Sequence, residues 1–155
     1  PRRVESALVT FRGVEVPWGP FDPAPLRKWA AAFRSPAGAT PLGNAVLQAS
    51  ALVLASPLDS RHLVVVTDGE NTAGPLPEEA MDSVKKRAGA GGAFVSMHFI
   101  AFDVDAAVFA GVKARGATLA SAASAEQLDK RLKFILEEEI LLESDTPRPA
   151  GPGGR

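Results

Sequence analysis

Acidic side chains follow two apolar runs in this sequence, and carboxylates in such positions can bind a metal ion. The run 63–66 is followed by Asp68, and the run 93–102 is followed by Asp103 and Asp105. Continuous apolar runs are typical of parallel strands buried on both faces. Open parallel sheets bind ligands outside the carboxyl ends of their strands. Asp68 is therefore predicted at a metal or ligand site, unless its Asp-Gly pair forms only a turn in which Asp caps its own backbone.

A second polar group lies in the segment 38–43, Gly-Ala-Thr-Pro-Leu-Gly, which predicts the start of a helix that runs to about Ala55. Thr40 is a favourable N-cap residue, and proline is favoured at the first helical position. The hydroxyl of Thr40 is therefore expected at a helix terminus, where hydrogen bonding to the helix backbone is its simplest role.

The elements that position these groups alternate along the chain. Two strands joined by a short turn come first, and helices and strands then alternate, which predicts right-handed crossovers and a parallel sheet with helices on both faces. The expected strands are 6–11, 14–16, 63–66, 93–102 and 117–120, and the expected helices are 25–33, 40–55, 77–88, 106–112 and 125–142.

Prolines and apolar spacing add detail to the first third of the chain. Pro17 is expected to stop the second strand or to place it at a sheet edge. The segment 18–25 carries three further prolines and is expected to be a loop. Trp29 and Phe33 lie on one apolar face of the helix 25–33, so we expect them in the core.

Composition narrows the class of protein. The chain has 155 residues, of which 46% are hydrophobic and 23% charged, so one globular domain is expected. A net charge of -1 gives no support for a nucleic-acid-binding surface. No apolar run is long enough to span a membrane. The absence of cysteine fits a reducing compartment, and we expect a cytoplasmic protein.

In the order of its elements and in the segments Thr40-Pro41-Leu42-Gly43 and Val66-Thr67-Asp68-Gly69-Glu70, the chain resembles the von Willebrand factor A (vWA) family. The resemblance covers about residues 4–142 and is closest to bacterial intracellular members, including the tellurite-resistance-associated group. It implies a three-layer, Rossmann-like α/β fold whose mostly parallel sheet carries one antiparallel edge hairpin. It also implies a metal ion-dependent adhesion site (MIDAS) at the carboxyl edge of the sheet, with Thr40 and Asp68 as ligands of Mg²⁺ or Mn²⁺.

The sequence departs from the family pattern at the first site segment, Asp-x-Ser-x-Ser. The nearest candidates, Asp59-Ser60 and Asp82-Ser83, are in the wrong places. The family's first strand and first helix are missing with it, and that strand would lie between the strands 6–11 and 63–66. Because the chain starts at Pro1, we expect a vWA domain over 1–142 that is truncated at its N-terminus, followed by a flexible Pro/Gly-rich tail or linker over 143–155. The alternative is a degenerate member whose site binds no metal.

The resemblance implies a protein-interaction module and no enzymatic activity. In the complete protein the bound cation would accept an Asp or Glu carboxylate from a partner such as an AAA+ ATPase or a stress-operon protein. In this fragment metal binding is expected to be weak or absent. A less favoured alternative is a phosphoryl-transfer enzyme that holds Mg²⁺ with Asp68, Asp103 and Asp105. The sequence offers neither a nucleophile motif nor a phosphate-binding loop for that reaction.

Other polar residues are expected in ordinary roles. His98, within an apolar run, is expected to be a core residue with one hydrogen bond, and His62 is expected to be exposed. Glu70 and Asn71 are expected to be loop residues that add negative potential near the ion.

Overall fold

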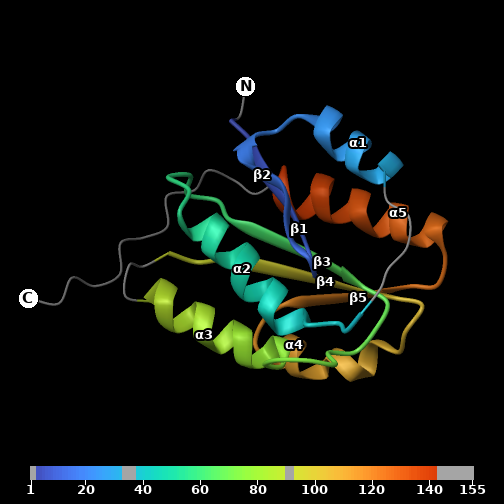
Figure 1. The fold of residues 1–155 in the computed structure, drawn as a ribbon. Coiled ribbons are helices and arrows are strands. Elements are labelled where there is room, and N and C mark those ends of the chain that lie inside the picture. The colour runs from blue at the N-terminus through green and yellow to red at the C-terminus, as the bar shows by residue number, and fades with distance from the viewer. Residues whose placement is uncertain (1–2, 33–37, 90–92, 143–155) are drawn as a thin grey trace, which may run out of the picture.

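The computed structural model describes residues 3–32, 38–89 and 93–142, which form two sheets and six helical segments of five residues or more (Figure 1). In chain order the elements are β1 (Glu5–Thr10), β2 (Gly13–Pro20), α1 (Pro23–Ala32), α2 (Leu42–Leu54), β3 (His62–Thr67), α3 (Pro77–Gly89), β4 (Ser96–Phe102), the 3-10 helix η1 (Ala106–Phe109), α4 (Ala110–Ala114), β5 (Thr118–Ala122), α5 (Ala125–Phe134) and the π-helix η2 (Ile135–Ile140).

The central layer is a parallel sheet with the strand order β3-β4-β5. Val65 pairs with Phe99, and Phe99 pairs with Leu119, so the three strands are in continuous register. Helix α3 connects β3 to β4, and α4 connects β4 to β5. Helices α2, α3 and α4 lie on one face of this sheet and α5 on the other (Figure 1). The predicted α/β fold with a parallel sheet between helical layers is therefore confirmed.

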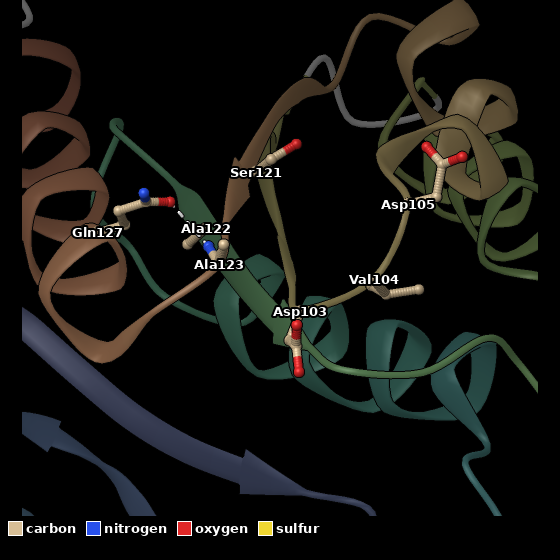
Figure 2. A pocket seen from close by; sticks show the side chains of 7 residues that line it. All are labelled: Asp103, Val104, Asp105, Ser121, Ala122, Ala123 and Gln127. Atoms are coloured by element: carbon tan, nitrogen blue, oxygen red, sulfur yellow. Dashed lines mark hydrogen bonds between the residues drawn. The ribbon is translucent and has the colours of Figure 1, made fainter.

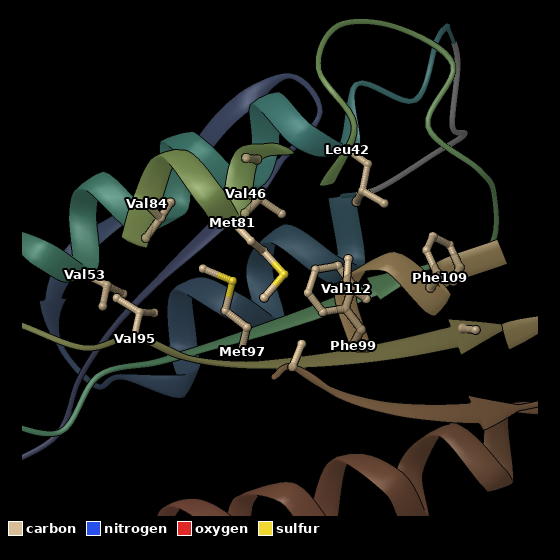
Figure 3. Close-up of a cluster of buried hydrophobic side chains, with 13 residues drawn as sticks. Leu42, Val46, Val53, Met81, Val84, Val95, Met97, Phe99, Phe109 and Val112 are labelled. Carbon is tan, nitrogen blue, oxygen red and sulfur yellow. The ribbon is translucent and has the colours of Figure 1, made fainter. Parts of the chain in front are cut away.

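The main hydrophobic core lies between this sheet and helices α2 and α3 (Figure 3). The Phe99 side chain at its centre is 1% exposed and packs among Val46, Met81 and Met97. Successive side chains of a strand point to opposite faces of the sheet. Ile100, the neighbour of Phe99 in β4, therefore lies on the other face and packs with Ile135 in a smaller cluster under α5. Strand β4 thus contributes side chains to a hydrophobic cluster on each face of the sheet, as its unbroken apolar run predicts.

The N-terminal hairpin pairs β1 with β2 in an antiparallel ladder that contains two register shifts. Strand β2 runs through Pro17 and ends at Pro20, so the prediction of a loop from Trp18 onward is wrong for its first three residues. Each strand of this two-stranded sheet pairs on one side only. Proline is tolerated in β2 because its missing N–H can lie on the unpaired side, where no ladder hydrogen bond needs a donor. The Glu5 carboxylate anchors the hairpin by accepting hydrogen bonds from Trp18 Nε1 at 2.8 Å and Ser56 Oγ at 3.1 Å.

The hairpin and the parallel sheet are separate, since no ladder joins them within the described residues. The described residues therefore do not form the predicted single, mostly parallel sheet that includes the hairpin. Helix α2 contacts β1, β2 and β3 and holds the two sheets beside each other. Val66 of β3 is 43% exposed, so the prediction that this strand is buried on both faces is wrong. The cause is that α5 packs over β4 and β5 and leaves this end of β3 uncovered.

The remaining helices agree with prediction apart from their ends. The helix expected over 77–88 is confirmed as α3, and that expected over 106–112 is a 3-10 turn followed by α4. The helix expected over 125–142 changes from α-helical to π-helical geometry at Ile135. Trp29 is only half-buried, so its predicted core position is wrong in this chain, and Phe33 lies outside the described residues. The expected tail 143–155 also lies outside them.

Among the described residues, no helix combines the length and the apolar character that crossing a membrane requires.

Candidate metal site at the carboxyl edge of the sheet

Two loops meet at the carboxyl end of β3, and they carry Thr40 and Asp68. Helix α2 begins at Leu42 with Pro41 in the N-cap position, and no side chain caps it. The prediction that Thr40 is the N-cap is therefore wrong. In the described part of the chain the Thr40 hydroxyl makes no hydrogen bond, whereas its carbonyl oxygen accepts one from Leu42 N at 2.9 Å. The hydroxyl is thus available to a ligand.

Reciprocal backbone contacts join the Thr40 loop to the loop after β3. The Thr40 N–H donates to Thr72 Oγ1 at 2.7 Å, and the Thr72 N–H donates to the Thr40 carbonyl at 3.0 Å. The Thr72 hydroxyl thereby serves as the hydrogen-bond acceptor that the Thr40 N–H needs, in place of a backbone carbonyl. Sequence reasoning missed Thr72, whose only signal was its place four residues after Asp68.

Asn71 and Gly43 form a second link between the same loops. Asn71 Oδ1 accepts a hydrogen bond from Gly43 N at 3.3 Å, and its Nδ2 donates to the Gly74 carbonyl at 3.2 Å. A Cβ added to Gly43 would lie 2.0 Å from the Pro75 carbonyl oxygen, so only glycine permits this approach. The expectation that Asn71 serves mainly to add negative potential is replaced by a positioning role.

The Thr67 side chain, and not that of Asp68, makes the hydrogen bonds that stabilise the turn after β3. Thr67 Oγ1 donates to the Gly69 carbonyl at 2.9 Å and accepts from Gly69 N at 3.3 Å. Asp68 is exposed, and its carboxylate makes no hydrogen bond in the described part of the chain. The alternative in which Asp68 caps its own turn therefore has no support in the structure.

Thr40 and Asp68 belong to one small surface. A Cβ built on Gly69, the neighbour of Asp68, would lie 3.9 Å from Thr40 Oγ1. A hydroxyl and a carboxylate oxygen are both ligands that Mg²⁺ accepts, and this ion commonly retains several waters. Across residues 3–32, 38–89 and 93–142, no group of three or more His, Cys, Asp or Glu side chains could hold a metal ion. The arrangement thus offers one hydroxyl and one carboxylate as candidate oxygen ligands at this edge of the sheet.

Asp103 and Asp105 follow the end of β4 and form no metal-binding group with Asp68. They line a shallow pocket of about 370 Å³ between the ends of β4 and β5, with Ser121 and Gln127 (Figure 2). Asp105 accepts a hydrogen bond from Ala107 N at 2.9 Å and caps η1. Asp103 has a φ of 51°, in the left-handed region that Asp tolerates better than most residues. Asp68, Asp103 and Asp105 thus form no three-carboxylate metal group, as the phosphoryl-transfer alternative would require.

The two histidines agree only in part with their predicted roles, since His98 is a core residue as expected. His98 is 5% exposed, and polar groups of His62, Thr118 and Glu139 all lie within hydrogen-bonding or ion-pair distance of its ring. His62 is the first residue of β3, is half-buried, and stacks on His98 with the ring centroids 5.5 Å apart. The expectation of a single hydrogen bond for His98 and an exposed His62 is therefore wrong. No pattern in the sequence predicts this pairing, because the two residues meet only through the register of β3 and β4.

In comparisons with known proteins, no family model and no curated protein matches this chain.

Proposed function

We propose that this chain is the larger part of a vWA-type protein-interaction module that binds a partner carboxylate through a divalent cation. The observation that carries the proposal is the linkage of the Thr40 loop to the loop after β3 by Thr72 and Asn71. Three side-chain and backbone contacts hold the two loops together at the carboxyl end of one strand. Neither Thr40 Oγ1 nor the Asp68 carboxylate is used in those contacts.

Thr40 and Asp68 would hold Mg²⁺ or Mn²⁺ at this edge. Bound there, the cation would supply a positively charged coordination position for an Asp or Glu side chain of a partner protein. The exposure of Asp68 suits such a role, since a partner must reach the ion from solvent. In the cell, an AAA+ ATPase or a stress-operon protein is the kind of partner that we propose.

The exposed edges support the further proposal that a strand and a helix from an upstream segment complete the fold. Strands β1 and β3 each pair on one side only within the described residues, and α2 holds them side by side. Helices α1 and α5 contain no buried residue, although each has an apolar stripe. An added strand between β1 and β3 would pair with both edges, and an added helix would cover Val66. That segment would also bring the remaining metal ligands.

Conservative substitution of Thr40 tests the site in the chain extended by its native upstream sequence. Thr40→Val removes the hydroxyl at nearly constant volume, whereas Thr40→Ser retains it. We expect Mn²⁺ affinity to fall at least about tenfold in the first variant and to stay within about threefold of wild type in the second, since about 1.4 kcal/mol corresponds to a factor of ten. Equal Mn²⁺ affinity in both variants would exclude Thr40 as a ligand and leave a metal-free vWA-like scaffold.

A further inference from the structure

The Asp68–Gly69 pair lies in an open segment outside the regular elements of the fold. Strand β3 ends at Thr67 and α3 begins at Pro77, so neither residue of the pair is held by a strand ladder or a helix. Asp68 is exposed, and in the described part of the chain its carboxylate accepts no hydrogen bond. This is also the only Asp-Gly pair in the sequence, so an unengaged carboxyl group and a following glycine coincide here.

An aspartate that precedes glycine can react with the backbone of its neighbour. The Gly69 nitrogen attacks Cγ of the protonated Asp68 carboxyl group, an N–Cγ bond forms, a Cγ–O bond breaks, and the hydroxyl leaves with the amide hydrogen as one molecule of water. The product is a five-membered succinimide ring, which water reopens at either carbonyl. Cleavage between the nitrogen and Cγ restores aspartate, whereas cleavage between the nitrogen and the backbone carbonyl carbon of Asp68 yields isoaspartate.

The surroundings of Gly69 leave its nitrogen open to this attack. A Cβ built on Gly69 would have only Thr40 Oγ1 within 4 Å, at 3.9 Å, apart from its chain neighbours. The glycine itself has no side chain that would hinder ring closure. Its N–H donates to Thr67 Oγ1 at 3.3 Å, which is longer than the usual upper limit of about 3.2 Å for such bonds. Within the described residues, one long hydrogen bond is thus the polar restraint on this nitrogen.

The other aspartates lack this combination of features. Each of them precedes a residue with a side chain, which hinders ring closure. Asp82 also lies within α3, and its carboxylate pairs with Arg115 at 2.9 Å. Asp59 resembles Asp68 most, because it is exposed in the loop between α2 and β3, but the residue after it is Ser60. Asp59 therefore provides a comparison for Asp68 within the same molecule.

We propose that Asp68–Gly69 is a covalent modification site, at which spontaneous isoaspartate formation alters the loop after β3 as the protein ages. Isoaspartate directs the main chain through Cβ and Cγ, which lengthens the backbone by one carbon atom and leaves the carboxyl group on Cα. The extra atom lies between Thr67 and Gly69, whose mutual hydrogen bonds stabilise the turn, so the turn must rearrange. The displaced carboxyl group would be lost to the proposed metal site, but the reaction itself requires no metal.

Peptide mass spectrometry with electron-transfer fragmentation tests the proposal, because its fragment ions distinguish isoaspartate from aspartate at each position. The wild-type chain of 155 residues is incubated without metal at mildly acidic pH and body temperature, and samples are digested over several weeks. We expect isoaspartate to accumulate several-fold faster at Asp68 than at Asp59. Equal or slower accumulation at Asp68 would overturn the proposal. Because no metal is added, neither result depends on the proposed function.

Gly69→Ala is the matched variant, and the structure indicates that it folds. Gly69 does not have a positive φ, and the added Cβ would meet Thr40 Oγ1 only at an ordinary van der Waals distance. The new methyl group hinders ring closure, so we expect isoaspartate formation at Asp68 to fall several-fold while the rate at Asp59 stays the same. An unchanged rate at Asp68 in this variant would overturn the proposal, since the reaction would then not depend on the glycine.

Discussion

Thr40 and Thr72 lie 32 positions apart in the sequence and hold each other through two hydrogen bonds, one of them only 2.7 Å long. The donor of each bond is a backbone N–H, but the acceptors differ, since one is the Thr72 hydroxyl and the other is the Thr40 carbonyl. A side chain is therefore built into the connection between the two loops of the candidate metal site.

Replacing Thr72 with valine removes the acceptor that satisfies the Thr40 amide. We expect Thr72→Val to lower the free energy of unfolding by about 0.5–1.5 kcal/mol, because the Thr40 N–H loses its intramolecular hydrogen bond at a solvent-exposed position. In the chain with its upstream sequence it should also weaken Mn²⁺ binding. Thr72→Ser keeps the hydroxyl and is the matched control. Chemical denaturation and calorimetry measure the two effects, and equal values for both variants would show that the hydroxyl does not position Thr40.

Gly43 is expected to tolerate no side chain. A Cβ there would lie 2.0 Å from the Pro75 carbonyl oxygen, so Gly43→Ala must push the loop away from the start of α2. The expected loss in the free energy of unfolding is about 1–3 kcal/mol or more. Gly89, the last residue of α3, has nothing within 4 Å of the same position. Gly89→Ala should therefore change stability by less than about 0.5 kcal/mol. Urea denaturation of both variants decides the matter, and similar losses would contradict the close approach.

Phe99 is expected to dominate the main core. The ring is 1% exposed, whereas that of Phe94, before β4, is 54% exposed. Phe99→Ala should lower the free energy of unfolding by about 3–5 kcal/mol through lost burial and a residual cavity. Phe94→Ala removes the same atoms from an exposed site and should cost less than about 1 kcal/mol. A Phe94 variant as damaging as the Phe99 variant would place the core elsewhere.

Acid should weaken the attachment of the hairpin through Glu5. The hydrogen bond from Trp18 is the largest cause that lowers the pKa of the Glu5 carboxyl from its ordinary value, and Arg3 and Ser56 act in the same direction. A lowered pKa means that the folded state favours the carboxylate, so this stabilisation is present above the ordinary value of 4.5 and is lost as the pH falls below it. Glu5→Gln should be less stable than wild type at pH 7, and this difference should shrink toward pH 3.

Thermal unfolding of wild type and Glu5→Gln at several pH values measures that prediction. A stability difference that stays constant from pH 7 to pH 3 would show that the Glu5 charge contributes nothing.

The parallel sheet was predictable because local patterns determine it. The unbroken apolar run of β4 and the charge order of α3, with Glu78 and Glu79 first and Lys86 and Arg87 last, each predict their element without neighbours. Asp68 became a candidate site residue through its place after an apolar run, whereas Thr40 became a candidate ligand only through the family resemblance.

The features that the sequence did not predict depend on neighbours in space. Strand β2 continues through Pro17 because its edge is free, and Val66 is exposed because no helix covers that end of β3. The roles of Thr72 and Asn71 come from contacts with Thr40 and Gly43, about 30 residues earlier in the chain. Likewise, His62 and His98 meet only because the register of two parallel strands brings them together. Sequence spacing carries no information on such contacts.

Calorimetric titration with Mg²⁺ and Mn²⁺ tests the central claim most directly. The samples are the 155-residue chain, the same chain with its native upstream sequence restored, and the longer chain with Asp68→Ala. We predict binding by the longer chain, weak or no binding by the shorter one, and loss of binding in the Asp68→Ala variant. Absence of binding in the longer wild-type chain, or unchanged binding after Asp68→Ala, would contradict a metal-dependent module at this edge of the sheet.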